Sequence, residues 1–157
     1  MSKPPHRIRP GSTYFVSTAT WERRELFRVN EISKILVQRI LTCRDKGVYR
    51  LHEFVVMPNH FHLLMTPSET VTLEKAVLLI KGGASCEIHK QRGTKMEIWQ
   101  PGFHDWTIRN REDYRAKVRY IQMNPMQARL VERPAEWPFS SASGKFPLDA
   151  VPEKYKT

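Results

Sequence analysis

The chain has 157 residues, of which 40% are hydrophobic and 27% charged, so it is long enough for one packed domain and too apolar for a disordered chain. Its formal net charge of +10 favours a polyanionic partner, nucleic acid first, although a basic surface with no dedicated partner would have the same composition. No apolar run reaches the length of a membrane span and the first twelve residues lack a secretory signal, so we expect neither a membrane protein nor a secreted one.

The first expected elements are a strand and a helix. Residues 13–20 are rich in aromatic and β-branched side chains, which predicts a strand. Apolar residues then recur at helical spacing over 32–43, with Asn30 as the expected N-cap and Gly47 as the expected stop. An amphipathic helix of this kind needs a surface to pack on.

A hairpin and a second helix follow. The runs 49–57 and 60–66 are typical of strands, and Pro58 and Asn59 between them suit a tight turn. The helical period returns over 73–88, where a pair of adjacent glycines weakens the middle of the expected helix.

The last expected elements are a short strand and a third helix. Residues 103–108 form an apolar stretch that predicts the strand, and Asn110 is placed to cap a helix that Pro125 should end. The order strand, helix, strand, strand, helix, strand is that of the ferredoxin-like βαββαβ unit. We therefore predict an α+β fold with an antiparallel sheet, two helices on one face and the additional C-terminal helix, a partner or a ligand on the other.

The pair His60 and His62 is the sharpest local motif. Side chains two apart in a strand point to the same face, so both imidazoles converge while Phe61 points into the core. Two neutral imidazoles at this spacing can hold one divalent cation and leave positions open for a phosphate oxygen. Two structural histidines on a hairpin would show the same spacing. We expect the pair to be exposed, so that substituting either histidine hardly affects folding.

Tyr120 is the candidate nucleophile, and Asn124 lies four residues later on the same helical face. A tyrosine hydroxyl that attacks a phosphodiester needs a divalent ion to neutralise the non-bridging oxygens, and the Asn124 amide oxygen can complete its ligand set. The alternative is a half-buried tyrosine followed by a helix-terminal asparagine. Tyr114 is the rival nucleophile, but it lacks the Asn-Pro sequence that follows Tyr120.

The segments VVMPNHFHLLMTP (55–67) and YRAKVRYIQMNPMQARLV (114–131) resemble the REP-associated tyrosine transposases, relatives of the single-tyrosine HUH transposases of bacterial insertion sequences. The resemblance extends to YFV (14–16), RRELF (23–27), WQPGFHD (99–105) and EWPFSS (136–141), and it covers about residues 11–143. It implies a catalytic domain over 13–143, between a basic tail at 1–12 and a C-terminal tail at 144–157.

The resemblance also implies roles. His60 and His62 would form the HUH metal pair, Tyr120 the nucleophile, and Asn124 the polar residue that assists a Mg²⁺ or Mn²⁺ ion. Such enzymes cleave single-stranded DNA, leave a 5′-phosphotyrosine and a free 3′-hydroxyl, and rejoin strands by the reverse step. Related enzymes recognise repetitive extragenic palindromes folded as hairpins.

Basic and aromatic side chains are available for DNA. The tryptophans expected to stack on bases are Trp21, Trp99 and Trp106. The cations expected to bind phosphates are Arg7, Arg9, Arg23, Arg24, Lys81, Lys90, Arg92 and Lys95.

We therefore expect a metal-dependent endonuclease and strand transferase for single-stranded or hairpin DNA, acting as a monomer or homodimer without a membrane partner. The two cysteines show no metal-type spacing and favour a reducing cytosol. The resemblance implies the bacterial cytoplasm, at the nucleoid. A catalytically silent DNA-binding protein on the same fold is the alternative. An RNA-binding ferredoxin-like domain is disfavoured, because the second and third strands carry no RNP-type aromatic pattern.

Overall fold

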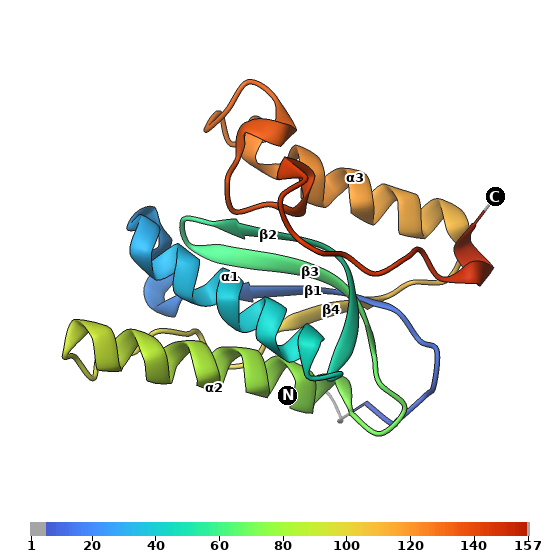
Figure 1. Ribbon diagram of the computed structural model, residues 1–157, viewed down its shortest axis with the longest axis horizontal. Helices are drawn as coiled ribbons and strands as arrows, with labels where there is room; N and C mark the ends of the chain where they lie inside the picture. The colour runs from blue at the N-terminus through green and yellow to red at the C-terminus, as the bar shows by residue number, and fades with distance from the viewer. Residues whose placement is uncertain (1–5, 157) are drawn as a thin grey trace.

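The computed structural model describes residues 6–156, so the expected N-terminal tail lies partly outside the described residues. The main elements, shown in Figure 1, are β1 (Tyr14–Ala19), α1 (Asn30–Asp45), β2 (Tyr49–Met57), β3 (His60–Pro67), α2 (Leu73–Arg92), β4 (His104–Thr107) and α3 (Arg111–Gln127). The predicted order of strands and helices is confirmed.

The four strands form one antiparallel sheet in the order β2-β3-β1-β4, which is the ferredoxin-like arrangement. Side chains from α1 and α2 fill one large core against the sheet, and α3 packs on β2 and β3 from the opposite side. Figure 1 shows α3 on its own side of the sheet. The predicted α+β class with an additional C-terminal helix is therefore confirmed.

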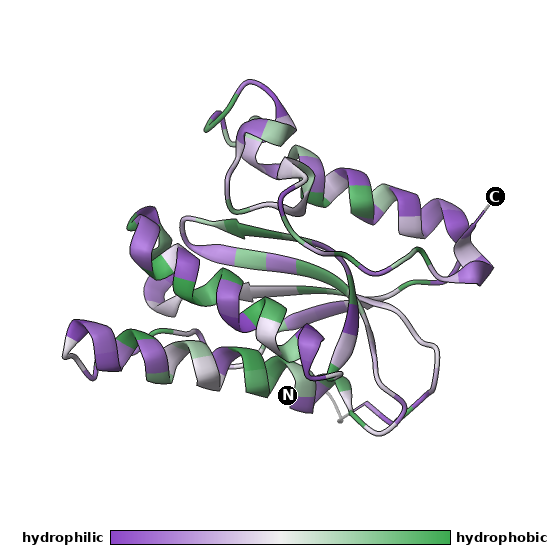
Figure 2. Cartoon of the chain, in the orientation of Figure 1, coloured by the Kyte–Doolittle hydropathy of each residue, from purple (hydrophilic) through white to green (hydrophobic). Residues whose placement is uncertain are grey.

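The central strand β3 is buried on both faces, and its alternation positions the histidines. Phe61, Leu63 and Met65 point into the core under α1 and α2, whereas Leu64 belongs to the smaller core under α3. Because side chains alternate along a strand, His60 and His62 share the α3 face with Leu64. Figure 2 shows that much of α3, which covers this face, is hydrophilic.

Two helix boundaries differ from prediction. Asn30 is the first residue of α1, and Val29 precedes it as an N-cap without a side-chain hydrogen bond. Pro125 lies inside α3, which continues to Gln127. Pro125 lacks the N–H that would bond to the Ile121 carbonyl, but its ring is buried in the protein, so tertiary packing offsets the loss and the helix continues.

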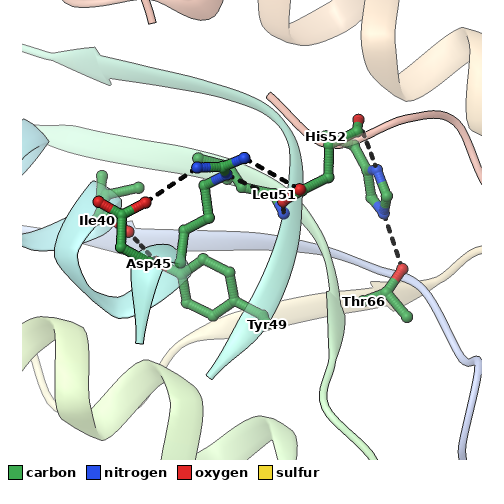
Figure 3. Close-up of polar contacts among 8 residues, drawn as sticks. Ile40, Asp45, Tyr49, Leu51, His52 and Thr66 are labelled. Atoms are coloured by element: carbon green, nitrogen blue, oxygen red, sulfur yellow. Dashed lines mark hydrogen bonds and ion pairs between the residues drawn. The ribbon is translucent and has the colours of Figure 1, made fainter. Parts of the chain in front are cut away.

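The described residues 144–156 lie against the body of the domain. The Asp149 carboxylate accepts hydrogen bonds from the Leu51 N–H (2.7 Å) and from Arg44 Nε and Nη2 (3.1 Å each). His52 Nε2 lies 2.8 Å from Thr66 Oγ1, and its Nδ1 lies 3.4 Å from the Asp149 carbonyl. Figure 3 shows the contact between His52 and Thr66. Burial alone would raise the pKa of Asp149, but the hydrogen bonds from Leu51 and Arg44 lower it. These contacts attach the C-terminal segment to the edge of β2.

No helix in the described part of the chain combines the length and the apolar character needed to span a bilayer.

Gly82 and Gly83 lie within α2, which is continuous through both. We expect substitution by alanine to change the stability of the fold in opposite directions at the two positions. A Cβ at Gly82 would meet no atom of the described residues within 4 Å, whereas a Cβ at Gly83 would lie 1.9 Å from Arg39 Nε, which donates to the Leu79 carbonyl at 2.9 Å. We expect Gly82→Ala to stabilise the fold by about 0.5–1 kcal/mol. The free energy of unfolding of Gly83→Ala should be at least about 1 kcal/mol lower than that of Gly82→Ala, because Arg39 must move and lose its hydrogen bond. Urea unfolding of both variants measures this difference, and equal stability would contradict the packing described.

Candidate active site

His60 and His62 lie with their ring centroids 4.7 Å apart at the end of β3 that follows the turn at 58–59. His60 is partly exposed, but the His62 residue is only 4% exposed. The expectation that both histidines are exposed is therefore wrong for His62. The reason is tertiary: Phe15 on β1 stacks on the ring at 5.1 Å, and α3 covers it from above.

His62 is a buried imidazole that lacks hydrogen-bond partners. Among residues 6–156, neither ring nitrogen has one within normal geometry, which is rare for a buried polar group. Burial, and then the nearby His60 and Lys117, lower the pKa of His62 to about 3, while the Val16 backbone opposes the shift. The ring is therefore neutral at physiological pH, and one of its nitrogens carries a free lone pair.

His60 is held by its neighbour in the turn. Its Nδ1 lies 2.7 Å from Asn59 Oδ1, so a neutral His60 donates its proton there and has its lone pair on Nε2. Burial and then the positive charge of Arg23 lower the pKa of His60, and a side-chain hydrogen bond with Asn124 opposes the shift. Both imidazoles are thus in the form that binds a metal ion.

Tyr120 on α3 lies beside this pair. Its ring centroid is 5.3 Å from that of His62 and 5.7 Å from that of Phe15, in edge-on arrangements. The residue is 51% exposed, so a substrate can reach its hydroxyl. Asn124, one helical turn later, contacts His60, and the structure therefore brings all four predicted residues of the site together within one chain.

Tyr114, the rival tyrosine, lies elsewhere. Its side chain is buried, it stacks on Tyr155 with ring centroids 5.2 Å apart, and burial raises the pKa of its hydroxyl well above the ordinary value. A buried phenol that is harder to ionise is a poor nucleophile. The geometry thus favours Tyr120.

A polar network fixes α3 over the sheet. Glu53 on β2 accepts hydrogen bonds from Ser141 Oγ at 2.8 Å and from Gln122 Nε2 on α3 at 3.3 Å. Burial raises the pKa of Glu53, and the two hydrogen bonds offset part of that shift. Because Gln122 lies between Tyr120 and Asn124 in sequence, this network sets how far the helix stands from the histidines.

Eight cations are predicted to bind phosphates. Among them, Arg23 lies near enough to the site for its charge to lower the pKa of both histidines. It belongs to a 3-10 turn in which Glu22 and Arg23 have φ values of 53° and 56°. Two consecutive non-glycine residues in the left-handed region cost about 1–2 kcal/mol each, and such strain is typical of functional sites. The strained turn presents Arg23 at the His60 side of the pair.

The other predicted cations are placed differently. Arg24 pairs with Glu22 at 3.0 Å, and Lys81 donates to the carbonyls of Gln100 and Gly102, so Lys81 attaches this loop to α2. Exposed cations on the far side of the sheet, at and after the end of α2, are Lys90, Arg92 and Lys95. The exposed segment before β1 carries Arg7 and Arg9.

Sequence reasoning missed two members of the site, Phe15 and Lys117. Phe15 belongs to a strand distant in sequence, and only the pairing of β1 with β3 brings it beside His62. Lys117 lies three residues before Tyr120, so helical spacing could have placed it on the same face. Of the predicted stacking tryptophans, Trp99 is buried and donates from Nε1 to the Lys81 carbonyl, whereas Trp106 is 44% exposed.

The donor set suits a cation with open positions. Two neutral imidazoles and the Asn124 amide offer two nitrogens and one oxygen, and a cation would give one His62 nitrogen a partner that it lacks among the described residues. No group of three or more His, Cys, Asp and Glu side chains among residues 6–156 is arranged to hold a metal. His104 lies on the same face of the sheet as His62, but Ser17 on β1 lies between them. The two histidines are therefore two strand spacings, or about 10 Å, apart, too far to bind one ion together.

Comparison with known proteins defines the class. The family model described as "Transposase IS200 like" matches residues 12–124, which is most of the chain and includes the histidine pair, Tyr120 and Asn124. The chain belongs to this transposase family.

Two relatives narrow the assignment. The REP-associated tyrosine transposase of Escherichia coli K12 is 30% identical over 145 residues, covering 88% of this chain and 84% of the relative. A solved structure of a REP-associated tyrosine transposase bound to a REP hairpin superposes with a TM-score of 0.74 at 28% identity, covering 100% of this chain and 95% of the other. Within the family, the chain is a member of the REP-associated tyrosine transposases.

A crystal structure of a Deinococcus radiodurans protein, 22% identical with a TM-score of 0.55 over 79% of this chain and 97% of the other, shares the fold.

Proposed function

We propose that this transposase is a divalent-metal-dependent endonuclease and strand transferase that cleaves single-stranded DNA beside hairpins formed by repetitive extragenic palindromes. One observation carries the proposal: the two unpartnered nitrogens of buried His62 lie next to the half-exposed ring of Tyr120. A buried polar ring without partners destabilises a fold, so its retention beside an accessible hydroxyl favours a ligand-binding role.

Four side chains would serve the reaction. His60, His62 and Asn124 would hold Mg²⁺ or Mn²⁺, and the mixture of imidazole and amide donors suits Mn²⁺ at least as well as Mg²⁺. A bound ion would neutralise the non-bridging oxygens of the scissile phosphate. The low pKa of His62 keeps it a ligand rather than a cation throughout the physiological range.

Tyr120 would perform the bond exchange. Its Oη forms a bond to phosphorus, the bond from phosphorus to O3′ breaks, the phenolic proton passes to water, and the leaving O3′ takes up a proton from solvent. The number of phosphodiester-type bonds is unchanged, so the free 3′-hydroxyl of the same or another strand can reverse the step without an energy source. Phe15 orients both the His62 ring and the phenol, and Arg23 offers a charge to the incoming strand.

The hairpin partner is inferred from the relatives. The solved relative is bound to a REP hairpin, and this chain aligns with it along its whole length. The net charge of +10 favours such a partner through counterion release. The exposed cations at the end of α2 and before β1 are available to bind the duplex part at a distance from the site.

The test is a covalent trapping assay on the full chain with a hairpin oligonucleotide that has single-stranded flanks. With Mn²⁺ or Mg²⁺ and a label at the 3′ end, we expect a labelled protein band on a denaturing gel, because a 5′-phosphotyrosine retains the DNA on the 3′ side of the break. A 5′ label should appear instead on a shortened free strand. Adding EDTA should abolish both products.

Two results would contradict the proposal. A protein band carrying the 5′ label would reverse the polarity of the attack. Tight binding of the oligonucleotide with no adduct under any divalent ion would favour the catalytically silent DNA-binding protein.

A further inference from the structure

An aromatic pair with an ammonium above it lies next to the candidate active site. Phe15 on β1 is directly opposite Trp106 on β4, so both rings share the α3 face of the sheet. Lys117 Nζ on α3 lies 4.9 Å from the Phe15 ring centroid and 4.5 Å from that of Trp106. Attraction to the two π faces holds the lysine in place without neutralising its charge.

The indole of Trp106 is fixed in orientation and accessible. Its Nε1 donates to Asp113 Oδ2 at 2.9 Å, and the same carboxylate oxygen accepts from the Arg109 N–H at 3.1 Å. The Arg109 guanidinium carbon lies 5.3 Å from the ring centroid. Nevertheless the residue is 44% exposed, because α3 packs on β2 and β3 and leaves the β4 edge of the sheet more open.

The charge of Lys117 is available to a ligand. Within residues 6–156, no carboxylate forms an ion pair with it at 4 Å or less. It lies close enough to the site for its charge to act on His62. Arg23 acts on the same histidine pair from the strained turn after β1, so two cations without ion pairs within the described residues flank the site.

We infer that Trp106 and Lys117 form a nucleotide subsite for the single strand that enters the active site, in which Lys117 binds a phosphate next to the scissile one and the exposed indole stacks on the adjoining base. Aromatic side chains beside cations are how proteins bind single strands, since each base has a π face and each linkage a charge. The strand would then cross the sheet face from Arg23, past the histidines, to the β4 edge. This subsite rests on the proposed function for the identity of the strand.

The test measures binding without cleavage. Wild-type and variant chains are titrated in EDTA with two fluorescent oligonucleotides, a REP hairpin with single-stranded flanks and the same hairpin without flanks, at several salt concentrations. Lys117→Gln should weaken binding of the flanked strand and reduce the slope of log K against log salt by about 0.7, the value for one phosphate contact on a single strand. Trp106→Ala should weaken it about 5- to 150-fold, as expected for one lost stack.

Three comparisons make the test specific. Trp106→Phe should retain most of the affinity, because phenylalanine also stacks on a base. This variant shows whether the loss in Trp106→Ala comes from the missing ring or from altered folding at the sheet edge. Lys75→Gln makes the same change of charge on exposed α2, on the opposite side of the sheet, and should leave the salt slope unchanged. Binding of the hairpin without flanks should be nearly the same for all variants.

The outcomes separate the subsite from the proposed function. Suppose that the wild type forms the covalent adduct, and that Lys117→Gln and Trp106→Ala both bind with wild-type affinity and salt slope. This result would overturn the subsite and leave the proposed function supported. The expected losses of binding in a protein that never forms an adduct would support the subsite and overturn the cleavage reaction. Equal losses on both oligonucleotides would also overturn the subsite, because the two residues would then contact the hairpin.

Discussion

Tyr120→Phe is expected to abolish the covalent protein–DNA adduct, lowering its rate of formation at least about 1,000-fold, because the variant has no atom to bond to phosphorus. The phenyl ring can keep the edge-on contacts with His62 and Phe15, and the position is half-exposed, so folding should be unaffected. The measurement is the trapping assay with a 3′ label, combined with a binding titration. DNA binding should remain within a few-fold of wild type.

Tyr114→Phe is the matched control for this prediction. It removes the hydroxyl of a second tyrosine on the same helix that is buried against Tyr155. Adduct formation should continue in this variant. An adduct that persists in Tyr120→Phe and disappears in Tyr114→Phe would show that the nucleophile has been assigned to the wrong side of α3.

His62→Leu is expected to lose the adduct and at the same time to make the protein more stable at pH 7. The wild type buries an imidazole whose two nitrogens have no hydrogen-bond partners in the described part of the chain, and an unsatisfied buried polar atom costs about 1–3 kcal/mol. Leucine fills a similar volume without polar atoms. A gain of 1 kcal/mol should raise the Tm of a domain of this size by about 2–4 °C. Such opposite changes in stability and activity are typical of functional residues.

The same substitution should change the acid sensitivity of the fold. In the unfolded chain a histidine takes up its proton near pH 6.5, but burial lowers the pKa of His62 in the folded protein to about 3. Between these values the unfolded state binds more protons, so the wild type loses stability as the pH falls from about 6.5 towards 3. His62→Leu removes this group, and its free energy of unfolding should depend less on pH over that interval.

Urea unfolding at pH 7 and at pH 5 measures both effects. His104→Leu, an exposed histidine on the same sheet face, is the control that should keep the wild-type acid sensitivity. A His62→Leu protein that is less stable than wild type at pH 7 and equally sensitive to acid would mean that the ring has partners in solution.

Local patterns were sufficient for the elements and for two pairs of site residues. The hairpin of β2 and β3 follows from two β-rich runs around Pro58 and Asn59, and strand alternation alone puts His60 and His62 on one face. Helical spacing likewise puts Asn124 one turn after Tyr120. Boundaries were less predictable, because burial of Pro125 allowed α3 to continue past a residue that usually ends a helix.

What the sequence determined by itself is the order of the elements and which side chains share a face within each of them, since both depend on interactions between residues close in the chain. Tertiary structure alone decided that α3 covers the histidine face, that His62 is buried against Phe15, and that Lys117 lies over Phe15 and Trp106. These relations depend on strand register and on the packing of a helix about sixty residues away from the histidines, and no local periodicity encodes them.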